Sequence, residues 1–172
     1  MEVGSIIPSS RFLERKITEA VRADSAKLLV ELGPGTGGTT RALLRAMGPE
    51  ARLLAIEINP GFVEVLSRWP DKRLIAHEGS ATDIRGILEK LELPAPDVVV
   101  SGIPFSTMTR PLGRDILRSV HDALAPDGAF VAYQVRDRVH ALGREVFGRA
   151  AIKRELRNVP PMRVYRWEKQ AA

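Results

Sequence analysis

The chain has 172 residues, enough for one domain with its own core and too few for a separate substrate-binding domain. Its 44% hydrophobic and 27% charged residues exclude a disordered chain. Cysteine is absent, which excludes disulfides and thiolate sites, and His77, His121 and His140 lack ligand spacing, so we expect no metal. The net charge of +5 favours an anionic partner, either nucleic acid or a membrane surface.

The first segment lacks a long apolar run, so we expect neither a signal peptide nor a transmembrane span and predict a cytoplasmic protein. Ser9 or Ser10 can cap a helix that continues to Asp24, with an apolar side and a net basic polar side. We therefore predict an N-terminal amphipathic helix over residues 5–24. It either covers the sheet edge or the cofactor, or contacts a membrane.

Short apolar runs then alternate with longer helical patterns, which predicts a mostly parallel sheet flanked by helices. Seven strands are expected, over residues 27–32, 52–58, 73–77, 97–101, 129–135, 151–157 and 163–168. Helices are expected over residues 39–47, 60–69, 82–91 and 111–126. The order predicts a single Rossmann-like α/β domain over residues 1–172, with a seven-stranded, mostly parallel sheet.

A glycine loop joins the first strand to the next helix, with the sequence Glu31-Leu32-Gly33-Pro34-Gly35-Thr36-Gly37. Glycines let the backbone approach a ligand, and the helix N-terminus adds free N–H donors. A nucleoside triphosphate is excluded, because Thr39 stands where its phosphate-binding motif requires lysine. A dinucleotide fits G-x-G-x-x-G at Gly33, Gly35 and Gly38, with Glu57 about 20 residues downstream as the ribose-binding acid.

Two features favour S-adenosylmethionine over a dinucleotide. Glu31 precedes the first glycine, where it would oppose a pyrophosphate but can hold the ammonium group of a methionine moiety. The chain is also too short for a second domain. Glu57, at the end of the second strand, would accept hydrogen bonds from both ribose hydroxyls. We expect S-adenosylmethionine as the cofactor and S-adenosylhomocysteine as its product.

The segments 30–37 and 55–60 resemble class I methyltransferases, especially ribosomal RNA adenine dimethylases and bacterial phospholipid N-methyltransferases. Ser80 stands where the family commonly has an aspartate against the adenine amine, and a hydroxyl binds that amine more weakly. The resemblance implies a cofactor site made of Ser9, Ser10, Glu31, Gly33, Gly35, Thr36, Gly37, Thr39, Glu57, Ile58, Gly79, Ser80, Ala81 and Ser101.

The segment Ser101-Gly102-Ile103-Pro104-Phe105 separates the two branches. Adenine dimethylases carry Asn-x-Pro-aromatic after the fourth strand, and Gly102 stands in the place of that asparagine. The segment is similar to the Ser-Gly-Leu-Pro-aromatic motif of bacterial phosphatidylethanolamine N-methyltransferases, and segments 8–13 and 158–165 resemble that family as well. The resemblance implies stepwise methylation of phosphatidylethanolamine towards phosphatidylcholine, with nucleic acid the less favoured partner.

A lipid ammonium must lose its proton before it can attack the sulfonium methyl in line. Tyr133, Tyr165 and water are the candidate bases, and the Ser101 hydroxyl and the backbone near Ile103 can orient the amine. The expected catalytic residues are Ser101, Ile103 and Tyr165. The expected substrate-binding residues are Pro104, Phe105, Arg110, Arg163 and Tyr165, and strand alternation puts Arg163 and Tyr165 on one face and Arg166 on the other.

Three alternatives remain open: an RNA adenine N6-methyltransferase, a methyltransferase of another amino lipid such as an ornithine lipid, and a non-enzymatic module that senses the cofactor. We expect peripheral association with the inner leaflet of a bacterial membrane. The basic first helix would supply it, because each cation near an anionic leaflet contributes about 1 kcal/mol.

Overall fold

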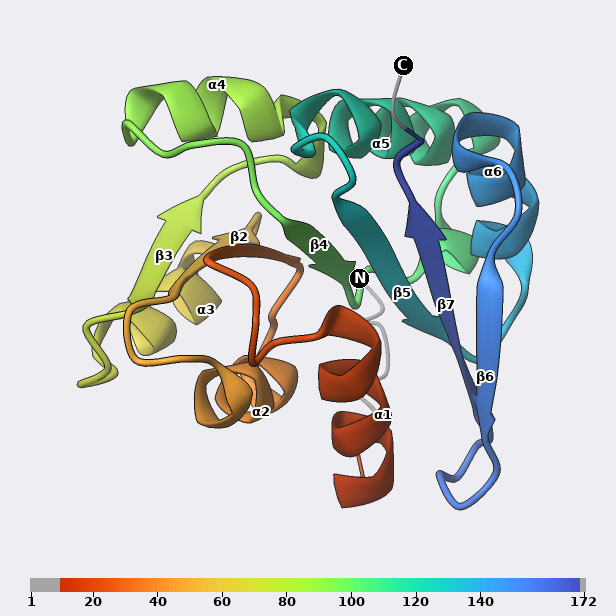
Figure 1. Ribbon diagram of the computed structural model, residues 1–172, viewed down its shortest axis with the longest axis horizontal. Helices are drawn as coiled ribbons and strands as arrows, with labels where there is room; N and C mark the ends of the chain where they lie inside the picture. Colours follow the sequence, from red (N-terminus) through yellow and green to blue (C-terminus); the bar gives the residue numbers. More distant parts are fainter. Residues whose placement is uncertain (1–9, 171–172) are drawn as a thin grey trace.

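The computed structural model describes residues 10–170, which form a seven-stranded sheet between two layers of helices (Figure 1). The strands lie in the order β3-β2-β1-β4-β5-β7-β6. Neighbours from β3 to β5 are parallel, and β7 is antiparallel to both β5 and β6. The strands are β1 (Leu28–Leu32), β2 (Arg52–Glu57), β3 (Leu74–Glu78), β4 (Val98–Ser101), β5 (Ala129–Gln134), β6 (Ala151–Glu155) and β7 (Met162–Glu168).

Helices cover both faces of the sheet. Apolar side chains of α1 and α2 pack against one face, and those of α4, α5 and α6 pack against the other (Figure 1). Among the described residues, no helix combines the length and the apolar character needed to cross a membrane. The helices are α1 (Arg11–Val21), α2 (Gly38–Ala46), α3 (Pro60–Ser67), α4 (Ile84–Lys90), α5 (Arg110–Ala123) and α6 (Arg138–Phe147), with short 3-10 turns η1 (Ala81–Asp83) and η2 (Phe105–Thr107).

Local capping explains where two of the helices begin. The Ser10 hydroxyl accepts a hydrogen bond from the backbone N–H of Leu13 at 3.3 Å and caps α1. The Asn59 carboxamide oxygen accepts from the N–H of Gly61 at 2.9 Å, and Pro60 occupies the first turn of α3. Because α3 starts so soon after β2, the chain turns sharply just beyond the end of that strand.

The register of the parallel strands brings four loops to one edge of the sheet. Leu32, the last residue of β1, pairs with Ile56 of β2 on one side and with Ser101 of β4 on the other. Glu57 follows Ile56 and pairs with Glu78 at the end of β3. The carboxyl ends of β1, β2, β3 and β4 therefore lie side by side, where open α/β sheets bind their ligands.

The start of α1 is tied to the loop between β6 and β7. The N–H of Ser10 donates to the Asn158 side-chain oxygen at 3.1 Å, and Lys16 pairs with the buried Glu155 carboxylate at 3.1 Å. Arg157 also pairs with Glu155, and its guanidinium lies 4.1 Å from the ring centroid of Phe12. We call Ser10, Lys16, Glu155, Arg157 and Asn158 the hairpin corner.

The structure confirms the predicted α/β sheet and all seven predicted strands, with end shifts of up to two residues. Of the predicted first helix, α1 is described from Arg11, and residues 5–9, including Ser9, lie outside the described residues. The helix α6 was not predicted. Gly143 interrupts its apolar pattern and lowers its helix propensity, but a Cβ there would lie 2.6 Å from Cε2 of Trp167, so packing against β7 requires the glycine.

Candidate active site

The loop from β1 into α2 needs glycine at three positions. Gly33, Gly35 and Gly37 have φ angles of 68°, 55° and 84°, in the left-handed region that disfavours side chains. Gly37 is also sterically confined, since a Cβ there would lie 2.6 Å from Cη2 of Trp69. The N–H of Gly33 is used inside the sheet, where it donates to the Ile56 carbonyl at 2.9 Å. The loop is therefore a fixed turn with backbone exposed on its outer side.

Glu57 is held in place from two directions by backbone amides. One carboxylate oxygen accepts from the N–H of Gly35 at 3.1 Å, and the other accepts from the N–H of Asn59 at 2.9 Å. The side chain is 7% exposed, while that of the next residue, Ile58, is 77% exposed. A carboxylate oriented in this way can accept hydrogen bonds from a vicinal diol, and Ile58 offers an apolar surface for a flat ring.

Glu31 is a fully buried acid with an incomplete set of partners. Strand alternation directs it, like Leu29, to the face covered by α2, where the Thr40 hydroxyl donates to one oxygen at 2.6 Å. The other oxygen, Oε1, has no hydrogen-bond partner among the described residues. Burial, with a smaller contribution from Glu57, raises the pKa of Glu31 to about 7. The free oxygen can receive a cationic or donor group of a ligand.

The loop after β4 packs directly on the glycine loop. Ser101 is fully buried, and its hydroxyl accepts from the N–H of Ile103 at 3.2 Å. The N–H of Gly102 donates to the Leu32 carbonyl at 3.1 Å, and a Cβ at Gly33 would lie 2.9 Å from Cγ1 of Ile103. Ser101 and Ile103, both expected to orient an amine, thus lie against the expected cofactor loop.

Pro104 and Phe105, both expected to bind substrate, differ in their exposure. Pro104 is exposed at the start of η2, whereas Phe105 is fully buried in the core beneath α5 and α6. The ring of Phe105 therefore anchors the loop from below in this structure. Its predicted contact with substrate has no support from this geometry and stays a prediction.

The C-terminal candidates all lie in β7, and their contacts lead to β5, α6 and α1. Arg163 pairs in register with Gln134 at the end of β5 and donates to the Val135 carbonyl at 3.4 Å. Tyr165 is buried and stacks on His140 at 5.4 Å between ring centroids, while Arg166 faces the other side and donates to the Ala20 carbonyl in α1 at 2.6 Å. The predicted alternation along this strand is therefore confirmed.

Arg110 points towards α6, where Glu145 pairs with it and with Arg114. This ion pair lowers the pKa of Glu145. Arg110 is therefore paired with α6 in this structure.

The predicted cofactor residues Gly79, Ser80 and Ala81 follow β3. The N–H of Gly79 donates to the Glu57 carbonyl at 3.0 Å, which places the turn beside the acid. The Ser80 hydroxyl accepts from the N–H of Thr82 at 3.2 Å and caps η1, which starts at Ala81. Thr36 is exposed in the glycine loop, and Ser10 lies in the hairpin corner. The predicted cofactor residues thus gather at the ends of β1, β2, β3 and β4, except Ser10, and Ser9 lies outside the described residues.

Thr40 and Gln134, two residues at this edge, were not singled out from the sequence, and Tyr133 was named there only as a candidate base. Thr40 orients Glu31, and Gln134 donates from its side-chain nitrogen to the Ile103 carbonyl at 2.6 Å. The Tyr133 and Thr39 hydroxyls lie 3.0 Å apart. Thr40 lies nine residues from Glu31, whereas Gln134 and Tyr133 make their contacts across 31 and 94 residues, and no spacing rule in the sequence points to these contacts.

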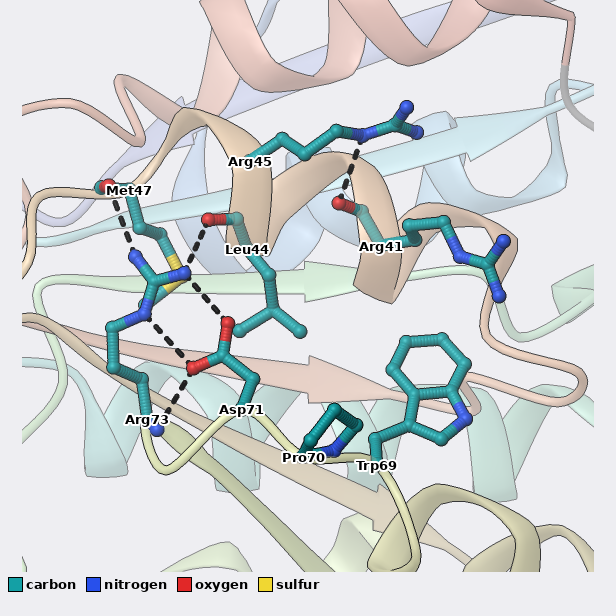
Figure 2. A pocket seen from close by; sticks show the side chains of 8 residues that line it. All are labelled: Arg41, Leu44, Arg45, Met47, Trp69, Pro70, Asp71 and Arg73. Carbon is teal, nitrogen blue, oxygen red and sulfur yellow. Dashed lines mark hydrogen bonds and ion pairs between the residues drawn. The ribbon is translucent and has the colours of Figure 1, made fainter.

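A shallow pocket lies beside α2, away from the glycine loop's outer side. Figure 2 shows the Arg73 guanidinium bonded to Asp71 and to backbone carbonyls at the end of α2, among them that of Leu44, while Arg41 lies over the indole of Trp69. The pocket is lined by Arg41, Leu44, Arg45, Met47, Trp69, Pro70, Asp71 and Arg73. Arg73 fixes the far end of α2, and Trp69 backs Gly37 at its start.

These residues fit S-adenosylmethionine better than a dinucleotide. The unpartnered oxygen of Glu31 suits the ammonium group of a methionine moiety and would repel a pyrophosphate. The Glu57 carboxylate suits a ribose diol, and the exposed Ile58 suits an adenine face. The donor set therefore matches a sulfonium nucleoside.

Comparisons with known proteins agree with this geometry. A model of the methyltransferase domain family matches residues 29–128. The ornithine lipid N-methyltransferase of Singulisphaera acidiphila is 31% identical over 166 residues, which cover 95% of this chain and 86% of that protein. The ribosomal RNA small subunit methyltransferase A of Laribacter hongkongensis is 39% identical over 71 residues, which cover 41% of this chain and 26% of that protein.

Solved structures share the fold at low identity. The O-methyltransferase from Bacillus cereus in complex with SAH has a TM-score of 0.75 at 13% identity, covering 95% of this chain and 84% of that chain. The O-methyltransferase TomG from Streptomyces achromogenes in complex with SAM has a TM-score of 0.74 at 18% identity, covering 96% and 82%. The family model spans more than half of this chain, which therefore belongs to the class I S-adenosylmethionine-dependent methyltransferases.

Proposed function

We propose that this enzyme methylates the amine of a membrane lipid, either an ornithine lipid or phosphatidylethanolamine and its methylated intermediates towards phosphatidylcholine. The similarity to an ornithine lipid N-methyltransferase over 95% of the chain supports a lipid amine. The observation that carries the proposal is the loop after β4, which offers a buried hydroxyl at Ser101 and backbone groups at Gly102 and Ile103 in place of a side-chain amide.

The chain's residues would orient and desolvate the amine rather than deprotonate it directly. Bound S-adenosylmethionine supplies an electrophilic methyl group on a sulfonium. Burial raises the pKa of the Tyr133 and Tyr165 hydroxyls, so neither forms a phenolate base at neutral pH. An apolar, cation-bearing site favours the neutral amine, and its proton leaves to water before the lone pair aligns with the methyl. Ser101 and the Ile103 backbone would hold the nitrogen.

Arg163 supports an anionic headgroup beside that amine. It lies in β7, in register with Gln134 at the end of β5, the residue that donates to the Ile103 carbonyl, and it shares a strand face with Tyr165. A guanidinium binds a phosphodiester or a carboxylate with equal geometric ease, so it suits phosphatidylethanolamine and ornithine lipid alike. Arg110 is paired with Glu145 in α6 and contributes to this role only if that pair opens.

Labelled cofactor and vesicles test the substrate. Vesicles of phosphatidylglycerol carry phosphatidylethanolamine, ornithine lipid or phosphatidylcholine, and a ribosomal RNA fragment is tested in parallel. We expect lipid-soluble label with one of the two amine lipids and none with phosphatidylcholine, which has no free amine. Label in RNA alone would support the RNA adenine methyltransferase. Tight S-adenosylhomocysteine binding without any labelled product would support a sensing module.

We further propose that the enzyme docks peripherally on an anionic membrane through α1 and α2. Arg11 and Arg15 in α1 and Arg45 in α2 line one groove, and Arg45 with Arg41 also lines the pocket beside Trp69 (Figure 2). Arg41 has no acidic partner within the described residues, and Arg45 has only Glu14 at 3.6 Å. Clustered guanidinium groups beside an indole suit an anionic interface.

Vesicle sedimentation tests this surface. Arg41→Gln/Arg45→Gln removes two cations, each contributing about 1 kcal/mol, so binding to phosphatidylglycerol vesicles should weaken roughly 30-fold. Arg85→Gln/Arg118→Gln makes the same charge change on α4 and α5 and should bind nearly as the parent does. Equal losses in the two double variants would mean that net charge, and not this face, drives association.

A further inference from the structure

The end of β5 contacts the first turn of α2 and the loop after β4 through two consecutive residues. Tyr133 reaches α2 on one side of the sheet, where its hydroxyl lies 3.0 Å from that of Thr39. Gln134 reaches the opposite side and donates to the Ile103 carbonyl at 2.6 Å. Because neighbouring residues of a strand point to opposite faces, the two side chains hold the loop after β4 from both sides.

The Tyr133 hydroxyl fills the space beside Gly102. A Cβ at position 102 would collide with the Tyr133 Oη atom, and would lie 3.0 Å from Cζ of the ring and 3.4 Å from the Gly33 carbonyl oxygen. Gly102 is not among the residues with a left-handed φ angle, so glycine is needed there for space and not for conformation. Tyr133 and Gly102 therefore form a matched pair, one large and one without a side chain.

The Tyr133 hydroxyl keeps its proton under ordinary conditions. Burial is the main cause of its raised pKa, and the Glu31 carboxylate raises it further. A neutral hydroxyl can donate or accept one directional hydrogen bond, and here its partner is Thr39 in the first turn of α2. That contact connects the end of β5, which packs against Gly102, to the helix that follows the glycine loop.

We propose that Tyr133 is a positioning residue for methyl transfer, which sets the distance between the glycine loop and the loop after β4. The proposal rests on the proposed function, because these loops would carry the methyl donor and the acceptor amine. Tyr133 contacts Thr39 on the donor side and Gly102 on the acceptor side. In-line transfer requires close alignment, and a misplacement of about 1 Å can reduce the rate about 100-fold.

A kinetic cycle tests this role. Tyr133→Phe keeps the ring but removes the hydroxyl, so kcat should fall about tenfold or more. The calorimetric affinity for S-adenosylhomocysteine should stay within about twofold of the parent, because the glycine loop and Glu57 are untouched. Thr39→Val removes the same hydrogen bond from the other side, and the double variant should lose little beyond either single variant. Ser67→Ala, which removes a hydroxyl in α3, should keep the parental kcat.

Gly102→Ala tests the matched pair independently of catalysis. The added methyl group meets the Tyr133 hydroxyl, so the variant should unfold at a lower temperature than the parent. Gly102→Ala/Tyr133→Phe removes the colliding oxygen and should recover much of that loss without recovering kcat. Such a rescue is not expected from a Tyr133 that merely packs elsewhere in the core.

The outcomes separate this proposal from the proposed function. A parent enzyme that methylates neither amine lipid refutes the proposed function, and the positioning role falls with it. A parent that turns over lipid while Tyr133→Phe keeps the parental kcat refutes the positioning role alone. Gly102→Ala with parental thermal stability likewise refutes the contact on which the role depends.

Discussion

Two buried glutamates in different regions of the same sheet differ in how their carboxylates are hydrogen-bonded. Glu31, in β1 at the cofactor end, has one hydrogen bond, from Thr40, and an oxygen without a partner in the described part of the chain. Glu155, in the hairpin corner, is 1% exposed and pairs with both Arg157 and Lys16. The pKa of Glu31 is raised to about 7, and that of Glu155 is lowered to about 2.

This difference in hydrogen bonding separates a site with room for a ligand group from one whose carboxylate is already paired within the protein. Burial without compensation disfavours the carboxylate of Glu31, so a cationic group brought to its free oxygen would be favourable. In the hairpin corner, hydrogen bonds from Arg157 outweigh burial, and Lys16 adds a second partner from α1. The end of the sheet with Glu31 therefore keeps a free acceptor for a ligand, whereas the ion pairs of the hairpin corner contribute to folding stability.

The largest expected effect comes from Glu57. Glu57→Gln removes one of the two acceptors that would receive the ribose hydroxyls, and hydrogen bonds to charged groups contribute about 1.5 to 3 kcal/mol each. We expect the affinity for S-adenosylhomocysteine to fall about 100-fold by calorimetry. Glu78→Gln, at the paired position of β3, should stay within about twofold of the parent. Similar losses in both variants would contradict a specific role for Glu57.

Glu31→Gln should weaken cofactor binding less, about tenfold at pH 8, and should abolish its pH dependence. In the parent, the ammonium group of the cofactor would bind the ionised carboxylate. Affinity should therefore fall about tenfold between pH 8 and pH 6, as Glu31 takes up a proton around pH 7. Calorimetry across this range measures both effects. An equal pH slope in parent and variant would assign the titration to another group.

Glu31→Gln should also stabilise the cofactor-free protein. The folded pKa of Glu31, about 7, lies above the ordinary value of 4.5, so folding retains a proton that the unfolded chain releases between these values. Stability is therefore lost as the pH rises from about 4.5 to about 7. At pH 8, Glu31→Gln should be about 1 to 3 kcal/mol more stable than the parent in urea unfolding.

The sequence predicted which residues gather at this edge of the sheet, because its signals there are local. The glycine loop, Glu31 and Glu57 lie within 27 residues and follow known spacings, and the strand ends of the sheet bring them together. The sequence did not predict that the Phe105 side chain is buried in the core, because a phenylalanine at this position can either contact a substrate or pack in the core. It missed Gln134 because a contact across 31 residues leaves no periodic trace.

The hairpin corner was predicted only in part, for the same reason. Segments 8–13 and 158–165 both resembled one family's motifs, but nothing in either segment indicated that they meet. The structure joins them through Ser10 and Asn158, 148 residues apart. The two motifs therefore meet in one contact, and that contact holds α1 against the loop between β6 and β7. Ser10 was expected to bind cofactor, and its role there stays a prediction beside this observed role.

The smallest effect on cofactor binding is expected in the hairpin corner. Glu155→Gln removes the buried carboxylate that pairs with Arg157 and Lys16, so the melting temperature should drop by several degrees. Cofactor affinity should stay within about twofold of the parent, and Glu168→Gln, an exposed ion-paired glutamate in β7, should change neither.

The pH dependence of Glu155 has the opposite sign to that of Glu31. Its folded pKa, about 2, lies below the ordinary 4.5, so its contribution is complete above pH 4.5 and is lost as the pH falls towards 2. The destabilisation caused by Glu155→Gln should therefore shrink in acid, while that of a packing variant would not. If Glu155→Gln instead weakened cofactor binding as strongly as Glu31→Gln, the hairpin corner would be part of the cofactor site. The displacement of α1 would then reach the glycine loop through α2.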